Sequence, residues 1–241
     1  MFSKTLIRVL AAGLILASSG ILAVFAHSAP YGGDGRPRKP TLADTVRLNV
    51  YADNWFDLYI NGERIAVDSI RFLPHNVVAV DVLPEYPMHI AVMARDNADP
   101  ETGMEYANTN IGDGGFILKL GDGTVTSAAW KVQVVSRGPL NGDVSNPRVE
   151  QSPIPDNWFL PDFDDSGWSA ATEYGEEAIG PKDVFHDYDF DGARFIWSRD
   201  VRLDNTVLFR HTAIRPPDGV ERADFRGINA LPLGPTGGRR R

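Results

Sequence analysis

The chain of 241 residues contains no cysteine. This absence excludes thiol catalysis, thiolate zinc sites, iron–sulfur clusters, disulfide bonds and a lipid anchor attached to cysteine. Any bound metal ion must therefore be held by oxygen atoms or by one of the five histidines.

The sequence also lacks the short motifs of common catalytic sites. Gly-x-Ser-x-Gly, a P-loop, Gly-x-Gly-x-x-Gly after a strand and His-Glu-x-x-His are all missing. Pairs of carboxylates are present, but they are too numerous for the sequence to single out one pair. We therefore expect a protein that is not an enzyme.

Positive charge is scarce in the body of the chain. Five of the 24 basic residues lie at the two ends of the chain: Lys4, Arg8 and the arginines at 239–241. The segment between them contains the other 19 basic residues and all 32 acidic residues. Residues 27–238 therefore carry a net charge of −13, against −8 for the whole chain. Such an acidic body repels phosphate backbones, so we expect no nucleic-acid binding.

The N-terminus has the pattern of an export signal, over residues 1–26. Lys4 and Arg8 precede an uncharged run at 9–26, whose end at Val24-Phe25-Ala26 offers small residues where a signal peptidase cuts. We predict cleavage after Ala26, which leaves no stable membrane span. An uncleaved anchor is the alternative, because the run approaches the length that crosses about 30 Å of hydrocarbon. Both cases place the body outside the cytoplasm, in the periplasm or secreted.

The body has the pattern of strands separated by turns. Apolar and polar residues alternate over residues 46–50 and 56–60, and the second run ends at Asn61-Gly62, a strong hairpin signal. Residues 64–67 are then the returning strand, and a second hairpin is expected around Gly121-Asp122-Gly123. Further strands are expected at residues 77–80, 89–94, 130–135, 195–198 and 207–209.

No segment shows a convincing helical period longer than two turns, and residues 168–178 are the best candidate for a helix. Strands without intervening helices predict an all-β fold, an antiparallel β-sandwich of the jelly-roll type with at most short helices. We place this domain at residues 44–211. It lies between a Pro- and Gly-rich linker at 27–43 and a Pro- and Gly-rich tail at 212–241.

Several stretches resemble a known domain family. The run from Tyr51 to Ala66, with Asp-Asn-Trp-Phe and an Asn-Gly turn, is similar to a strand pair of galactose-binding-like jelly-roll domains. Three shorter pieces, at 114–131, 163–170 and 193–197, are similar in the same order. Such domains accompany bacterial glycoside hydrolases of the rhamnosidase and β-glucuronidase types, in which a separate barrel is catalytic. The resemblance therefore implies a stand-alone binding or assembly module.

One acidic loop matches half of a calcium-binding motif. Asp187, Asp189 and Asp191 alternate and are followed by Gly192, as in the first half of an EF-hand loop. Alternate carboxylates can surround calcium, which takes about six to eight oxygen ligands at flexible angles. Position twelve is Ser198 instead of glutamate, so a solvated acidic loop is the alternative. We predict calcium as the candidate cofactor, bound at the three aspartates.

A mixture of aromatic and polar side chains near turns indicates a sugar site. Sugar rings stack on aromatic planes, while acids and amides bind their hydroxyl groups. Asp53, Asn54 and Trp55 provide both in three consecutive residues, and we predict ligand binding there. Packing is the alternative for most aromatics in this chain, since large apolar side chains are mostly buried. The other aromatics near turns are Tyr86, Tyr106, Trp158 and Trp168, whereas Trp130 and Trp197 lie in strand-like runs and are expected in the core.

Residues 96–113 form a third concentration of oxygen ligands, including Asp96, Glu105 and Asp113. They can build a second cation or sugar site. We favour the other interpretation, a long exposed loop in which acids and amides satisfy turns, because this composition is common in turns.

Together these features predict an exported, non-catalytic module that binds a carbohydrate or another cell-surface ligand. A structural or adhesive module that binds a protein partner is the alternative. A small exported polysaccharide-active enzyme is the second alternative, because one fold hosts many activities.

Overall fold

The structure is a computed structural model that describes residues 38–70, 76–96, 98–105 and 110–226. The predicted export signal and Tyr106 lie outside these residues. Fourteen strands and a few short helical turns are present, and every strand pair is antiparallel. The prediction of an all-β fold is confirmed.

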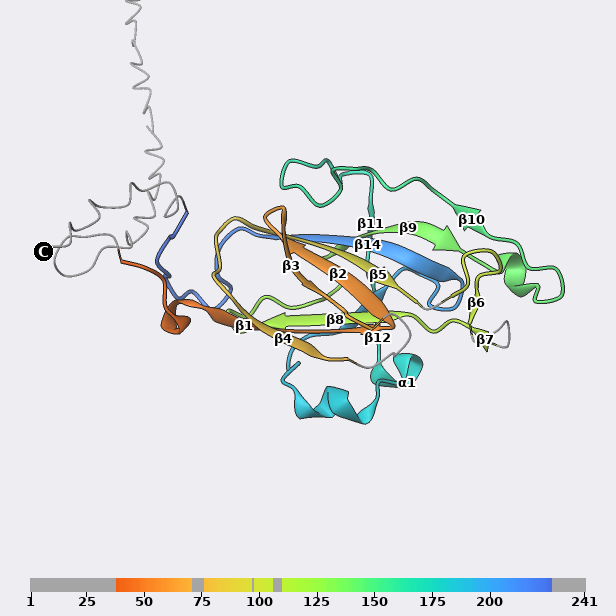
Figure 1. The fold of residues 1–241 in the computed structure, drawn as a ribbon, viewed down its shortest axis with the longest axis horizontal. Coiled ribbons are helices and arrows are strands. Elements are labelled where there is room, and N and C mark those ends of the chain that lie inside the picture. Colours follow the sequence, from red (N-terminus) through yellow and green to blue (C-terminus); the bar gives the residue numbers. More distant parts are fainter. Residues whose placement is uncertain (1–37, 71–75, 97, 106–109, 227–241) are drawn as a thin grey trace, which may run out of the picture.

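Two sheets face each other and form a β-sandwich (Figure 1). The first sheet has the strand order β12-β13-β8-β1-β4, and the second has the order β10-β9-β14-β5-β2-β3, with β11 also paired to β9. Strands β6 and β7 form a separate pair. The strands are β1 Val46–Asp53, β2 Trp55–Ile60, β3 Glu63–Val67, β4 Val78–Val82, β5 Met88–Arg95, β6 Met104–Glu105, β7 Asn110–Ile111, β8 Gly115–Leu120, β9 Lys131–Arg137, β10 Glu150–Gln151, β11 Ser169–Ala170, β12 Thr172–Tyr174, β13 Phe195–Trp197 and β14 Asp204–Ala213. The helix α1 spans Glu176–Ile179, and 3-10 turns span Leu42–Asp44, Leu140–Gly142 and Asp183–Asp187.

Both predicted hairpins are present. Asn61 and Gly62, between β2 and β3, have φ values of 51° and 86°. Two-residue hairpin turns require positive φ, which Asn and Gly adopt most readily. In the second hairpin the amide of Leu120 donates to the carbonyl of Thr124 at 2.8 Å, across the turn at Asp122. Local turn chemistry therefore sets both chain reversals.

The segment at residues 168–178, the best candidate for a helix, is helical only at its end. Ser169–Ala170 pairs with β9 of one sheet, Thr172–Tyr174 pairs with β13 of the other, and only Glu176–Ile179 is helical. Pairing with the two sheets satisfies the backbone donors and acceptors of this segment. That tertiary gain outweighs a weak local preference for helix.

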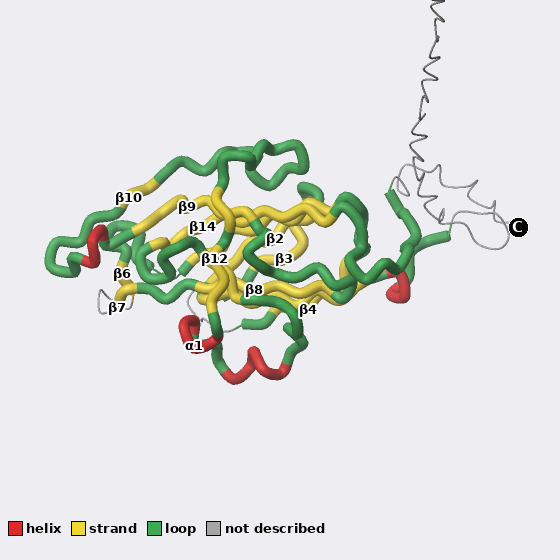
Figure 2. Tube along the Cα trace, turned by 180° about the vertical axis from the view of Figure 1, so that it is seen from behind, coloured by secondary structure: helices red, strands yellow, loops and turns green. Residues whose placement is uncertain are grey.

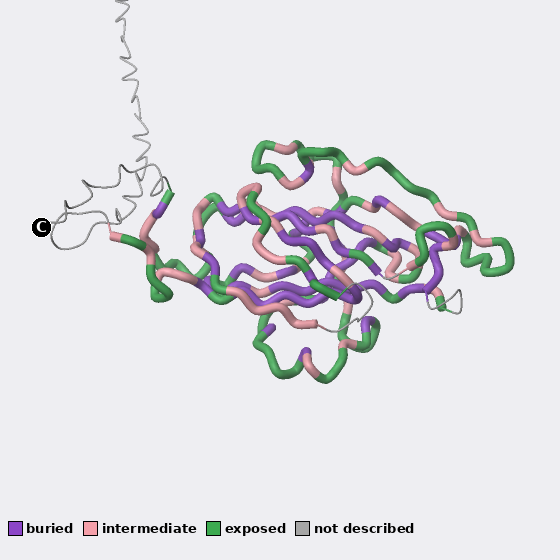
Figure 3. Tube along the Cα trace, in the orientation of Figure 1, coloured by how far each residue is buried: buried purple, intermediate pink, exposed green. Residues whose placement is uncertain are grey.

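The core lies between the two sheets, where Phe116, Trp130, Trp197 and Phe209 are fully buried. The rings of Phe116 and Phe209 stack at a centroid distance of 5.4 Å. Figure 3 shows the buried residues concentrated along the strands of both layers. The expectation that Trp130 and Trp197 belong to the core is confirmed, and these large rings supply much of the apolar area that holds the sheets together.

Long connections cover the outer faces of the sheets (Figure 2). Residues 176–194 lie over the five-stranded sheet, and residues 154–168 lie over the seven-stranded sheet. Buried Arg210 holds the second cover in place, because its guanidinium donates to Asp165 at 3.0 Å and to the carbonyl of Trp158 at 2.5 Å. The first cover forms the wall of the hollow described below.

The folded part of the chain is longer than residues 44–211 at both ends. Strand β14 continues to Ala213, and Phe225 is buried further along the chain. The guanidinium carbon of Arg38 lies 5.0 Å from the centroid of the Phe225 ring, and Arg38 also pairs with Asp44 at 2.5 Å. One aromatic side chain in a Pro- and Gly-rich stretch thus brings the two flanking segments together.

His211 provides a test of how pH affects the stability of the sandwich. Its imidazole stacks on Trp130 at 5.1 Å, and burial lowers the pKa of His211 below its usual value. The unfolded chain therefore binds a proton at His211 more readily than the folded chain does. Neutral His211 contributes fully to the free energy of unfolding above the unfolded pKa of about 6.5, and this contribution is lost as the pH falls below that value. In urea titrations, His211→Gln should flatten the decline of the unfolding free energy between about pH 7 and about pH 5, which one histidine can steepen by at most about 1.4 kcal/mol per pH unit. An unchanged slope would contradict this assignment.

Candidate ligand-binding site

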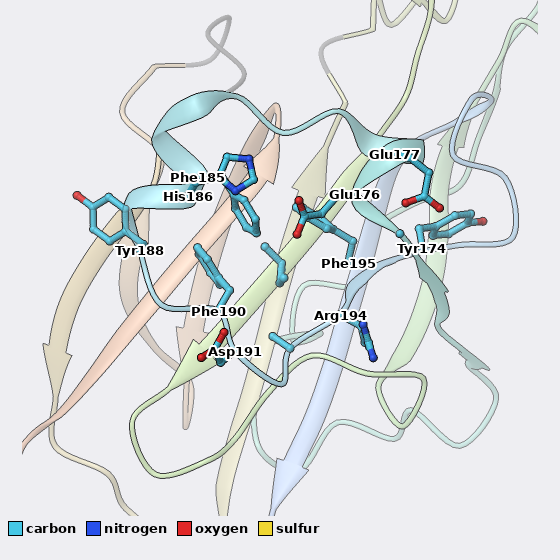
Figure 4. A pocket seen from close by; sticks show the side chains of 13 residues that line it. Tyr174, Glu176, Glu177, Phe185, His186, Tyr188, Phe190, Asp191, Arg194 and Phe195 are labelled. Atoms are coloured by element: carbon cyan, nitrogen blue, oxygen red, sulfur yellow. The ribbon is translucent and has the colours of Figure 1, made fainter.

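A hollow of about 620 Å³ lies on the outer side of the five-stranded sheet (Figure 4). Side chains of β8, β12 and β13 line it from the sheet, and residues 175–194 line it from the covering segment. The hollow therefore joins residues that lie about sixty positions apart in the sequence, such as Ile117 and Glu177.

The floor of the hollow is a cluster of apolar rings. Phe185 and Phe190 stack at 4.8 Å, and Phe185 also packs against Tyr51 and Phe195 of the sheet. Tyr51 and Ile117 are buried on the face of β1 and β8 that points away from the core of the sandwich. A sheet that is apolar on both faces needs a cover on each, and the covering segment provides it here.

Polar and aromatic side chains surround the opening. The exposed polar residues are Glu176, Glu177, His186, Asp191 and Arg194. Tyr188 is 40% exposed and lies at one edge, while Glu177 lies at the opposite edge (Figure 4). An aromatic ring with charged hydrogen-bonding groups around a concave opening is the composition of a small-molecule site.

The wall of the hollow is attached to the sandwich by side-chain to backbone hydrogen bonds. The amide of Asn49 donates to the carbonyl of Asp189 at 3.0 Å, and the hydroxyl of Thr126 donates to the carbonyl of Arg194 at 2.7 Å. Gly192 turns the chain with a φ of 84°, a value that residues with a side chain rarely adopt. The fold therefore sets the position of the rim residues before any ligand binds.

The three aspartates predicted to bind calcium lie on this wall and are exposed. Asp189 pairs with Lys119 at 2.5 Å and accepts the amide of Asp191 at 3.0 Å, and the pair with Lys119 lowers the pKa of Asp189. In the described ranges, Asp187, Asp189 and Asp191 do not bring three ligand atoms within 4.8 Å of one another. Calcium binding here stays a prediction, in which calcium would compete with Lys119 for Asp189.

Two of the three residues predicted to bind a sugar are buried. Asp53 and Asn54 are 4% and 1% exposed at the turn between β1 and β2. Asp53 faces a group of carboxylates: burial, followed by the charges of Asp113 and Glu105, raises the pKa of Asp53 to about 8. Sugar binding by these residues stays a prediction. In the fold, the carboxylate of Asp53 is buried and interacts with the charges of Asp113 and Glu105.

Other aromatics near turns have partners within the protein. The indole of Trp55 donates to the carbonyl of Asp68 at 2.9 Å, and the hydroxyl of Tyr86 bonds the carboxylate of Asp122. Trp158 is buried in the cover of the seven-stranded sheet. Packing thus accounts for these three side chains.

Sequence patterns alone do not identify most of the rim of the hollow. Glu176 and Glu177 lie within the candidate helix at 168–178, and no motif contains Tyr188 or Arg194 as a ligand-binding residue. One signal was present, since Tyr188 stands between two aspartates in the Asp-Tyr-Asp-Phe-Asp run at 187–191. No pattern in the sequence, however, places Glu177 across an opening from Tyr188.

Among the helices of the described residues, none combines the length and the apolar character needed to cross a membrane. Comparison with known proteins found no matching family model, no matching curated protein and no matching solved structure. The functional proposals below therefore rest on the residues of this chain.

Proposed function

We propose that this protein is an exported, non-catalytic module that binds carbohydrate in the hollow beside Tyr188. One observation carries the proposal: an exposed aromatic ring shares an opening with three carboxylates and a guanidinium. The export pattern of residues 1–26 and the resemblance to galactose-binding-like domains support the same conclusion.

The chemistry of the rim matches that of a sugar. Tyr188 offers a ring face for sugar C–H groups, Glu176 and Asp191 can accept hydrogen bonds from hydroxyl groups, and Arg194 can donate them. The volume of about 620 Å³ lies within the range of about 300–1,000 Å³ that is typical of small-ligand sites. Because carboxylates outnumber the guanidinium, we expect neutral oligosaccharides to bind better than uronic acids or sulfated sugars.

Replacement of Tyr188 tests the stacking contribution. Tyr188→Ala should weaken the binding of a neutral oligosaccharide about tenfold, because an aromatic contact contributes about 0.5–1.5 kcal/mol beyond its buried area. Tyr188→Phe keeps the ring and should bind like the wild-type protein. Binding is measured by isothermal titration calorimetry against a panel of neutral oligosaccharides and cell-wall fragments.

The control variant is Glu150→Gln, an exposed glutamate on β10 of the other sheet, which should leave the affinity unchanged. Absence of binding across the panel would contradict the proposal, and stable self-association in light scattering would then favour the structural alternative. Release of shorter sugars by the wild-type protein would contradict the non-catalytic part and favour the enzyme alternative.

A further inference from the structure

Three carboxylates meet at the end of the sandwich where β6 and β7 lie (Figure 1), and none of them lines the hollow. Asp96 follows β5, Glu105 ends β6 and Asp113 precedes β8. Asp96, Glu105 and Asp113 each place a carboxylate oxygen within 4.8 Å of the other two. The buried carboxylate of Asp53, at the end of β1, is near enough for the charges of Asp113 and Glu105 to act on it.

Two of these carboxylates are buried without enough hydrogen-bond donors. Asp96 is 4% exposed, and neither of its carboxylate oxygens has a partner. Glu105 is 2% exposed; its Oε2 accepts from the amide of Asn110 at 3.2 Å, but its Oε1 has no partner. A buried carboxylate that has lost its water and gained no donor is strongly unfavourable. A positively charged partner would therefore stabilise these buried oxygens.

This partner can be a proton bound to one of the carboxylates, or a metal cation. Burial and the neighbouring Glu105 raise the pKa of Asp96 well above its usual value, as expected for carboxylates crowded together without a counter-ion. One proton shared between Asp96 and Glu105 would still leave an oxygen of Asp96 without a donor. Exposed Lys182 offsets part of the charge near Asp53 and Asp113, but it brings one positive charge to four acids. A divalent cation satisfies several oxygens at once.

We propose that Asp96, Glu105 and Asp113 bind one calcium ion, with the buried carboxylate of Asp53 nearby. Calcium binds oxygen ligands at about 2.3–2.6 Å, so oxygens on opposite sides of it lie about 4.6–5.2 Å apart, which accommodates the observed spread. Magnesium binds at about 2.0–2.1 Å and keeps much of its water, so a carboxylate-rich, buried site favours calcium. Asp113 is exposed and gives the ion a path from solvent.

Gly112 offers a way to disturb this site without changing its charge. A Cβ atom at Gly112 would lie 1.6 Å from Oδ2 of Asp96, so the carboxylate occupies the space that a side chain would need. Gly112→Ala must therefore displace Asp96. Gly167 is the matched control, because a Cβ atom there meets no atom within 4 Å.

Calcium titration of the full chain, freed of metal with EDTA and followed by calorimetry, tests the proposal. The wild-type protein should bind one ion per chain, and magnesium should bind more weakly. Asp96→Asn and Gly112→Ala should weaken calcium binding at least about 100-fold, since each removes or displaces a charged ligand. Gly167→Ala should bind like the wild-type protein, and Asp189→Asn reports separately on the loop at 187–191.

Two results would overturn the proposal: no binding at millimolar calcium, or binding that survives Asp96→Asn and is lost in Asp189→Asn. The second result would assign the ion to the loop at 187–191. Asp96→Asn carries the test alone if circular dichroism shows that Gly112→Ala does not fold. The carbohydrate proposal does not depend on either outcome, since it rests on residues of the hollow.

Discussion

The Asp96→Asn variant should unfold at a higher temperature than the wild-type protein in EDTA, and at a lower temperature in calcium. Without the ion, folding must either bury the charge of Asp96 beside other acids or add a proton to it, and Asp96→Asn removes both costs. With the ion bound, the same charge is a ligand, and the wild-type protein is stabilised by mass action. The order of the two melting temperatures should therefore reverse between the two buffers.

The size of this effect follows from the affinity. Calcium at about 100 times its dissociation constant stabilises the folded state by about 2.7 kcal/mol. In a domain of this size, that raises the melting temperature by roughly 5–10 °C. The variant should show little of this increase. Differential scanning calorimetry in EDTA and in calcium measures both transitions.

Asp162→Asn is the control for this experiment, because Asp162 is exposed and should tolerate the change in both buffers. Its melting temperature should follow that of the wild-type protein in EDTA and in calcium. If Asp96→Asn were instead destabilised by the same amount in both buffers, Asp96 would have a purely structural role and the reversal would not exist.

Trp197→Ala should destabilise the protein by about 4 kcal/mol, since removing a fully buried tryptophan leaves a large cavity. The indole packs edge-on against Phe209 at 5.9 Å and donates to the carbonyl of Asp204 at 2.7 Å. It also fills the space beside Gly114, where a Cβ atom would lie 2.5 Å from the ring. The substitution therefore removes core packing and the support of the residue next to Asp113.

Urea unfolding followed by far-ultraviolet circular dichroism measures this loss without relying on tryptophan emission. Ile214→Ala is the control, because Ile214 is 71% exposed and its truncation should change the unfolding free energy by less than about 0.5 kcal/mol. A loss below about 1 kcal/mol in Trp197→Ala would mean that the sheets do not depend on this side chain.

Local signals predicted the parts of the fold that local chemistry controls. Asn61 and Gly62 adopt the positive φ values that a tight hairpin needs, whatever the rest of the chain does. Alternating apolar residues marked the strands because one face of each strand is buried against the facing sheet. Local signals do not predict the structure of residues 168–178, because most of that segment pairs with strands of both sheets and only its end is helical.

The candidate sites depend on contacts between distant segments. The sequence predicts sugar binding at Asp53 because Asn54 and Trp55 follow it, whereas in the fold the charges of Glu105 and Asp113 act on it. In the sequence, Asp96, Glu105 and Asp113 belong to a long polar segment whose composition favours an exposed loop. Burial turns that loop feature into a candidate metal site, and burial cannot be read from composition.

The sequence by itself determined the all-β class, both hairpins and the membership of Trp130 and Trp197 in the core, because alternation, turn residues and large apolar side chains act over a few positions. The tertiary structure alone decided which carboxylates meet and which rings border a hollow. The fold brings Asp96 after β5, Glu105 of β6 and Asp113 before β8 to one place, and the charge of an aspartate matters most where water is excluded and other acids are close.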